Sequence, residues 1–318
     1  MKQHLKTLII TCVLMAASMN ALAGLEEGKA AFTKKNYALA LKEFSPLAKG
    51  GNAVAETHLG FMYANGKGVA QDYKEAVKWY RLAANQGDAA AQFTLGSMYR
   101  EGQGVAQDHK QAVKWYVLAA GHGDAFAQYN LGLSYTNGQG VAQDYKEAVK
   151  WYRLAAEQGN IDAQNSLGMG YANGQGVPQD YQEALKWYKL AANQDDATAQ
   201  NNLGAMYREG QGVAQDYKEA VKWYRRAADQ GNPEGQNSLG AMYASGRGVG
   251  PSEAVAYALY NLSASIDPSS NNSAIVNRTA LASEMPPSLL NTAQTLTRDM
   301  SKPGNVLKAL DAYLKKPH

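Results

Sequence analysis

The chain has 318 residues, and its 31 basic and 28 acidic side chains give a formal net charge of +3 at pH 7. So small an excess of positive charge gives no electrostatic reason to expect binding to nucleic acid or to anionic lipid. The single cysteine, Cys12, lies in a segment that we expect to be removed, which excludes disulfides, a thiolate nucleophile and cysteine metal ligands from the mature chain. A lipoprotein signal ending at Cys12 is a weaker alternative, because threonine precedes the cysteine where a small residue is expected.

The first residues have the pattern of a secretory signal peptide. Lys2 and Lys6 precede an apolar run over residues 8–17, and an Ala-Leu-Ala cleavage site ends at Ala23. The run is too short to span a bilayer with an apolar core about 30 Å thick. The sequence therefore predicts cleavage near Ala23, a mature chain without a transmembrane segment, and export to the periplasm or out of the cell.

The stretch from Asp72 to Gly87 recurs along the chain with a period of 36 residues, which its Trp-Tyr pair makes visible. The tryptophans of the successive copies are Trp79, Trp115, Trp151, Trp187 and Trp223. A fixed period of this length is typical of a solenoid, in which each unit buries its apolar face on its neighbours. The sequence therefore predicts an all-α, right-handed α–α superhelix of helix–loop–helix repeats.

The periodicity also predicts the domain boundaries. We expect a signal peptide at 1–23, a degenerate repeat at 24–52, six repeats at 53–88, 89–124, 125–160, 161–196, 197–232 and 233–268, and a helical capping region at 269–318. A cap is expected because the last repeat of an array needs a polar outer face, and a separate functional tail is the alternative.

The second helix of each repeat is marked by its own end signals. Asp72 is a good N-cap, Glu75 occupies the capping-box position, and Gly87 can adopt the left-handed conformation that ends a helix. At 100° per residue the apolar positions form one wide face, which consists of Tyr73, Ala76, Val77, Tyr80, Ala83 and Ala84, with Trp79 and Leu82 at its flank. We therefore expect the tryptophans to be buried between repeats.

The first helix of each repeat carries a glycine in its interior, at Gly96 and its copies Gly132, Gly168 and Gly204. An interior glycine destabilises a helix by about 1 kcal/mol, so a close contact with an aromatic ring or another backbone is expected to offset it. The loop between the two helices contains a repeated Gly-x-Gly-Val, which we interpret as a turn and not as a phosphate site, because no strand precedes it.

These motifs resemble the Sel-one-like repeat (SLR) family, which is related to the tetratricopeptide repeat. The resemblance is carried by the pattern AQxxLGxMYxxGxGVxxD over residues 91–108, followed by AVKWY and a pair of alanines, and it covers roughly residues 37–265. It implies an adaptor scaffold for protein complexes, with exported bacterial members associated with envelope assembly, secretion or contact with host proteins. A cysteine-rich branch is associated with β-lactam binding, which this chain is not expected to share.

No residue pattern indicates catalysis, a cofactor or a metal site. His58, His109 and His122 do not form a zinc-protease motif, and no Gly-x-Ser-x-Gly is present. A row of lysines on the second helices, Lys78, Lys114, Lys150, Lys186 and Lys222, alternates with glutamates and is interpreted as a solvated face, with binding of an acidic polymer as the alternative.

The remaining side of the first helices changes from copy to copy and is the predicted partner-binding surface, with solvent-exposed positions that vary without a function as the alternative. In a tetratricopeptide-like superhelix this sector would line the concave groove. The residues expected there are Phe93, Arg100, Phe126, Tyr129, Asn165, Asn201, Asn202, Arg208 and Asn237. Removing the Phe93 and Tyr129 side chains is expected to abolish binding and to leave stability nearly unchanged.

The sequence therefore favours an exported, non-enzymatic scaffold that binds a protein or peptide in this groove. A cell-wall enzyme accessory or glycan-binding protein is the alternative, and a hydrolase of the β-lactamase-like branch is a weaker one. Neither the partner nor the oligomeric state follows from the residues.

Overall fold

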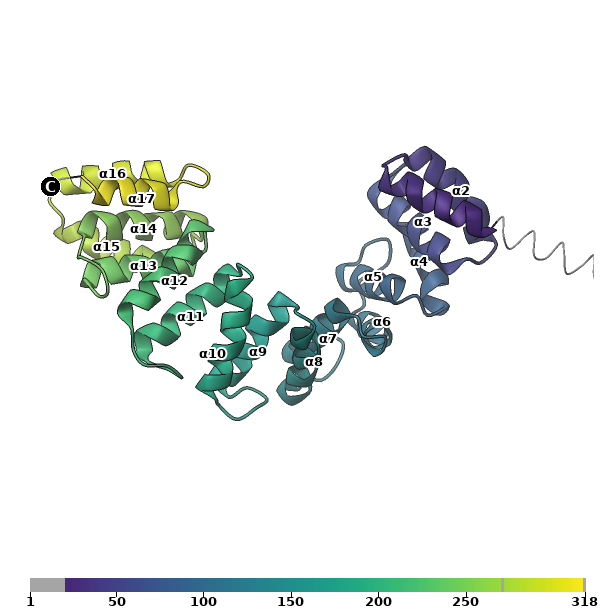
Figure 1. Cartoon of the computed structure of the whole chain (residues 1–318), viewed down its shortest axis with the longest axis horizontal. Helices are drawn as coiled ribbons and strands as arrows, with labels where there is room; N and C mark the ends of the chain where they lie inside the picture. Colours follow the sequence, from purple (N-terminus) through teal and green to yellow (C-terminus); the bar gives the residue numbers. More distant parts are fainter. Residues whose placement is uncertain (1–20, 270–271, 317–318) are drawn as a thin grey trace, which may run out of the picture. The chain divides into compact units, whose positions relative to one another are not determined.

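The computed structural model of the protein describes residues 21–269 and 272–316 (Figure 1). Cys12 and the apolar run of the predicted signal peptide lie outside these ranges. Throughout the described ranges the regular secondary structure is helical, with no strand, so the predicted all-α repeat architecture is confirmed.

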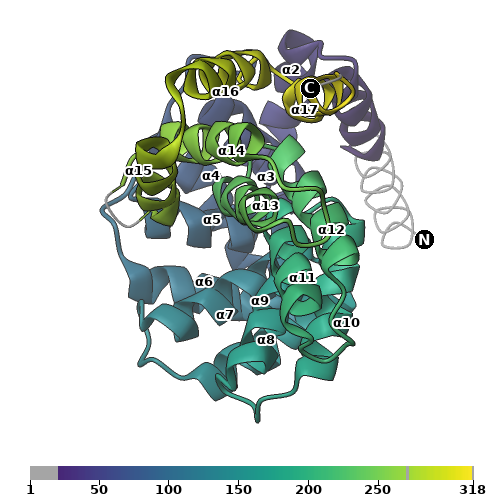
Figure 2. The same ribbon diagram turned by 90° about the vertical axis from the view of Figure 1, so that its left-hand side faces the viewer.

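The helices form antiparallel pairs, one pair to a repeat (Figures 1 and 2). Residues 21–33 are helical and are followed by α2 Tyr37–Lys49, α3 Ala53–Asn65, α4 Tyr73–Asn85, α5 Ala89–Glu101, α6 His109–Gly121, α7 Ala125–Asn137, α8 Tyr145–Glu157, α9 Ile161–Asn173, α10 Tyr181–Asn193, α11 Ala197–Glu209, α12 Tyr217–Asp229, α13 Pro233–Ser245, α14 Glu253–Ile266, α15 Ser273–Glu284, α16 Pro287–Met300 and α17 Val306–Leu314. The chain divides into two compact units, Met1–Ala155 and Ala156–His318, which we describe separately.

The second helices begin at the predicted N-cap residues, but the predicted capping box forms only one of its two hydrogen bonds. The Asp72 carboxylate accepts a hydrogen bond from the Glu75 N–H at 3.0 Å, as an N-cap should. The reciprocal bond of a capping box is not made, because the Asp72 N–H donates to the carbonyl of Tyr63 at 2.9 Å. The Glu75 side chain instead pairs with Lys78 at 2.6 Å.

The interior glycines of the first helices provide room for a tyrosine of the second helix, as predicted. A Cβ built on Gly96 would lie 2.8 Å from the Tyr116 ring. Gly132, Gly168 and Gly204 meet Tyr152, Tyr188 and Tyr224 in the same way, at 2.6 to 2.8 Å. Since real Cβ contacts are not this short, the ring occupies the space that a side chain would need. The contact explains why the helix tolerates a poor helix former at this position.

Buried glutamine side chains connect successive repeats, a role that the periodicity alone did not reveal. Gln200 donates to the carbonyl of Ala192, at the end of the preceding helix, at 3.1 Å, and its own carbonyl oxygen accepts from Gln230 at 2.9 Å. Gln164 makes the same two bonds, to Ala156 and from Gln194. Each amide thus adds a hydrogen bond to a carbonyl in the last turn of the preceding helix and binds the residue that ends the second helix of its own repeat.

Glu56 occupies this glutamine position in the first full repeat and is 2% exposed. Its carboxylate accepts a hydrogen bond from Gln86 at 2.7 Å, but an ionised carboxylate cannot donate to the preceding helix. Burial raises the pKa of Glu56 and the hydrogen bond from Gln86 lowers it, with a net upward shift. Glu56 therefore supports the fold when it is protonated, and this contribution is lost as the pH rises through its raised pKa.

Replacing Glu56 by glutamine is expected to stabilise the protein by about 1 kcal/mol at neutral pH, because the amide can make the donor bond seen in the other repeats. The gain should shrink as the pH falls below the ordinary glutamate range, where the wild-type side chain is protonated. Denaturant unfolding at pH 7.5 and at pH 4 measures it. Gln200→Glu is the matched converse and should destabilise only at the higher pH.

The second helices bury a narrower face than the sequence suggested. Ala76, Val77 and Tyr80 are buried, but Tyr73 is 38% and Leu82 is 48% exposed. The prediction that these two residues belong to the buried face was wrong. On α4 the neighbouring helices bury the face that includes Ala83 and Ala84 but do not extend to Leu82. Tyr73 is the first residue of the helix and remains partly exposed there.

Four of the five tryptophans pack against a core cluster that includes residues of the preceding repeat. Trp79, Trp115, Trp151 and Trp223 are partly buried against neighbouring core clusters, and Trp187 is 7% exposed. Trp151, on α8, contacts the cluster that contains Tyr116 of α6 and Leu131 of α7. A side chain at this interface couples the stability of its own repeat to that of the preceding repeat.

The C-terminal helices of the second unit lie on its last repeat, where Figure 2 shows α16 above α14. Val255 and Leu259 of α14 share one core cluster with Leu296 and Met300 of α16 and with Leu310 of α17. An ion pair between Arg225 and Asp311 fastens α17 to α12. These contacts cover the apolar surface that the last repeat would otherwise expose.

Candidate interaction surface

In the first unit the variable side of the first helices carries a row of aromatic side chains. The Phe93 and Phe126 ring centroids lie 6.1 Å apart, which brings α5 and α7 into contact on this side. Phe126 is 61% exposed. Phe61 of α3, which is 40% exposed, occupies another position of the same sector, and its ring centroid lies 5.4 Å from that of Phe32. Exposed rings grouped in this way are unusual without a binding partner.

Phe93 and Tyr129 are less accessible than the sequence suggested. The Phe93 ring lies 6.0 Å from the Tyr116 ring, and the Tyr129 ring lies 5.8 Å from the Tyr152 ring. Both side chains are half-buried and support the tyrosines that fill the glycine positions. Their removal would take away these ring contacts, so we no longer expect it to leave stability unchanged.

Arg100 connects two first helices at the edge of the aromatic row. Its guanidinium donates to the Asn130 side-chain oxygen on α7 at 2.7 Å and to Glu101 at 2.7 Å. The Glu101 ion pair leaves little net charge at this edge. A ligand would therefore meet aromatic rings and a neutralised arginine, and not a charged surface.

In the second unit the equivalent sector is polar and is connected from repeat to repeat. Asn202 donates to Asn165 at 3.2 Å, and Ser238 donates to Asn201 at 3.1 Å. Asn237 continues the row to α15 through Ser273 at 2.9 Å. Arg208, like Arg100, is paired with the glutamate that follows it, at 2.6 Å. The sector is thus uncharged overall and rich in amides.

The structure brings the predicted site residues into two groups, one in each unit. Phe93, Arg100, Phe126 and Tyr129 lie in the first unit, and Asn165, Asn201, Asn202, Arg208 and Asn237 lie in the second. Phe61 and Asn130 lie in the same sector but were not among the predicted site residues. The repeat spacing predicts them, because Phe61 is the copy of Ser97 and Asn130 is the copy of Thr94, and both of these positions belong to the variable side of the first helix.

The lysine row on the second helices is exposed and mostly paired. Lys78, Lys150 and Lys222 are 61 to 71% exposed and form ion pairs with the glutamate three residues earlier. Such exposed pairs contribute little to stability. This arrangement agrees with a solvated face.

No group of His, Cys, Asp or Glu side chains within the described ranges has the geometry of a metal site. Over the same residues, none of the helices combines the length and the apolar character that crossing a membrane requires.

The chain is similar to proteins with known structures. The family model of the Sel1 repeat matches residues 16–51, 53–88, 89–124, 125–160, 161–196, 197–232 and 233–267. A search of curated proteins found no match.

A Sel1 repeat protein from Oxalobacter formigenes has a TM-score of 0.68 and 32% identity, over 77% of this chain and 96% of that chain. The protein c5321, a protective antigen of uropathogenic Escherichia coli with an SLR fold, has a TM-score of 0.63 and 28% identity, over 96% of this chain and 73% of that chain. Sel1 repeat proteins typically mediate protein–protein interactions and are generally not enzymes. From the repeated family match and the 32% identical structure, the chain belongs to the Sel1 repeat family.

Proposed function

We propose that this protein is an exported, non-enzymatic scaffold that binds a partner protein or peptide along the variable sector of its first helices. The observation that carries the proposal is the exposure of Phe61 and Phe126 beside fixed, buried positions on the same helices. Ala91, Leu95 and their copies hold the repeats together, so the variable sector is free to differ without loss of the fold.

The chemistry of the sector supports a protein or peptide ligand. Aromatic side chains and arginine are the residues that contribute most to binding at protein interfaces, and the rings of the first unit are partly ordered by their neighbours. The amides of the second unit offer hydrogen bonds, since the Asn165 and Asn201 side-chain nitrogens have no partner within the described residues. Rings that are already held in place lose little entropy on binding.

Removing exposed rings tests the proposal. Phe61→Ala with Phe126→Ala is expected to weaken capture of a partner from an envelope extract by at least about tenfold, the effect of losing interface hot spots. Leu82→Ala with Leu118→Ala is the matched control, because both leucines are 48% exposed but lie on the second helices. Binding that survives the phenylalanine changes, or is lost equally in the control, contradicts the assignment.

Export is supported by the position of the proposed cleavage site relative to the core. Leu22 is 62% exposed, whereas Leu25 and Ala31 are buried against α2, so none of the described residues before the cleavage site, 21–23, belongs to the core. The expected result is a mature N-terminus at Gly24 in protein recovered from the periplasm or culture medium, measured by intact mass. Recovery of the uncleaved chain from the cytoplasm alone would contradict it.

A further inference from the structure

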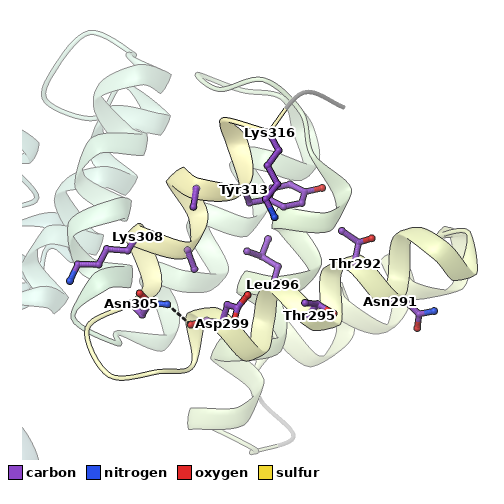
Figure 3. A pocket seen from close by; sticks show the side chains of 11 residues that line it. Asn291, Thr292, Thr295, Leu296, Asp299, Asn305, Lys308, Tyr313 and Lys316 are labelled. Carbon is purple, nitrogen blue, oxygen red and sulfur yellow. Dashed lines mark hydrogen bonds between the residues drawn. The ribbon is translucent and has the colours of Figure 1, made fainter.

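A second surface feature lies far along the chain from the aromatic row and is independent of the proposed function. A cavity of about 640 Å³ lies between α16 and α17 (Figure 3). Its volume is within the range of known ligand sites, roughly 300 to 1,000 Å³.

The base of the cavity is part of the core of the second unit. Leu296 and Ala309 line the cavity and are at most 9% exposed, and the neighbouring Leu310 is fully buried in the same core cluster. The start of α17 is fixed by the Asp229 carboxylate, which accepts a hydrogen bond from the Leu307 N–H at 3.2 Å. Because both walls are anchored to α12 and α14, the cavity is formed before any ligand arrives.

The lining combines an apolar centre with polar groups that accept hydrogen bonds. Figure 3 shows Leu296 in the middle of the lining, with Thr292 on α16 and Asn305 near the start of α17. The Thr292 hydroxyl donates to Ser288 and the Asn305 nitrogen donates to Asp299, so each side chain keeps an oxygen free to accept. A ligand that fits must present both an apolar group and N–H donors.

The rim of the cavity is positive. Lys302 pairs with Asp299 at 2.8 Å and lowers the pKa of that carboxyl, with smaller contributions from Arg298 and Lys316. Lys308 and Lys316 are among the lining residues, and Figure 3 shows the Lys316 amine directed towards Leu296 and the Lys308 side chain extended away from it. A carboxylate of the ligand would contact Lys316 directly and Lys308 after a change of rotamer, while Lys302 offsets the charge of Asp299 beside them.

We propose that the cavity between α16 and α17 binds an acidic peptide segment that carries an aliphatic side chain. The aliphatic group would lie on Leu296, Ala309 and Ala312, the flanking carboxylates would contact Lys308 and Lys316, and main-chain N–H groups would donate to Thr292 and Asn305. A peptide meets all three requirements at once. Phosphate lacks the apolar group, and an anionic lipid headgroup lacks the run of N–H donors.

The test uses the full mature chain and an array of immobilised octapeptides. One set has a single leucine among glutamates, a second replaces every glutamate by glutamine, and a third replaces the leucine by serine. We expect the first set to bind at least about tenfold more tightly than the other two. Equal binding to the glutamine peptides, or no binding to any set, would overturn the proposal.

Three variants locate the binding. Lys308→Gln with Lys316→Gln should reduce binding about tenfold, while Lys315→Gln, which removes an exposed neighbouring charge outside the cavity, should change it less than twofold. Ala312→Trp fills the cavity, keeps the charge and should abolish binding. Binding that persists in Ala312→Trp, or that falls equally in Lys315→Gln, shows surface attraction only. Preference for vesicles containing anionic lipid over the leucine peptides would assign the site to lipid, and either result overturns the proposal.

Discussion

Replacing Gly104 by alanine is expected to lower the free energy of unfolding by about 3 kcal/mol or more, from backbone strain and a clash combined. Gly104 has a φ of +71°, and a Cβ at this position would lie 2.3 Å from the carbonyl oxygen of Tyr73 in the preceding repeat. A backbone atom at the start of a helix cannot move aside as the end of a side chain can. Denaturant unfolding of the purified variant measures the loss.

Gly87→Ala is the control that separates the two causes. Gly87 also has a positive φ, of +90°, but nothing lies within 4 Å of the position of its Cβ. Its replacement should cost only about 1 to 2 kcal/mol, the strain of the left-handed conformation alone. Equal losses for the two variants would show that contact between the loop and the preceding repeat does not stabilise the array.

Trp151→Ala is expected to destabilise the protein by about 3 kcal/mol, because the indole ring fills the space between α8 and the core of the preceding repeat. The loss should spread beyond its own repeat, since stability in an array depends on the interfaces between neighbours. Hydrogen exchange of α6 and α7 would report that spread.

Trp151→Phe should cost much less than the alanine variant. The indole N–H is buried and has no hydrogen-bond partner among the described residues, so a phenyl ring loses volume but no hydrogen bond. A phenylalanine variant as unstable as the alanine variant would show that the indole N–H makes a bond that this structure does not contain.

Local signals predicted the repeat well because they act within a single helix. The caps at Asp72 and Asp88 follow from short polar side chains that bind the next N–H groups, and the positive φ of Gly87 follows from its missing side chain. Asp195 takes the place of such a glycine and keeps its positive φ of 65°. Its carboxylate gains an ion pair with Arg226 at 2.7 Å, which helps to offset the strain.

The sequence was less informative wherever one repeat meets the next. A helical wheel places Leu82 beside the apolar face, but only the packing of the next helix decides where burial stops. The helical wheel also places Phe93 and Asn201 on the solvent-facing side of the first helices. In the structure, however, Phe93 contacts Phe126 and Asn201 contacts Ser238 in the next repeat. A helical wheel gives the direction of each side chain around its own helix, but it does not give the distance to the helices of the neighbouring repeats.

The proposed partner-binding surface lies on the first helices. Hydroxyl-radical footprinting of the chain, with and without its captured partner, tests it most directly, because exposed phenylalanine and leucine side chains are oxidised in proportion to their accessibility. We predict that the partner protects Phe61 and Phe126 from oxidation and leaves Leu82, Leu118 and Leu154, which are 45 to 48% exposed on the second helices, unchanged. Protection of the three leucines with the two phenylalanines still oxidised would place the partner on the opposite side and contradict the account.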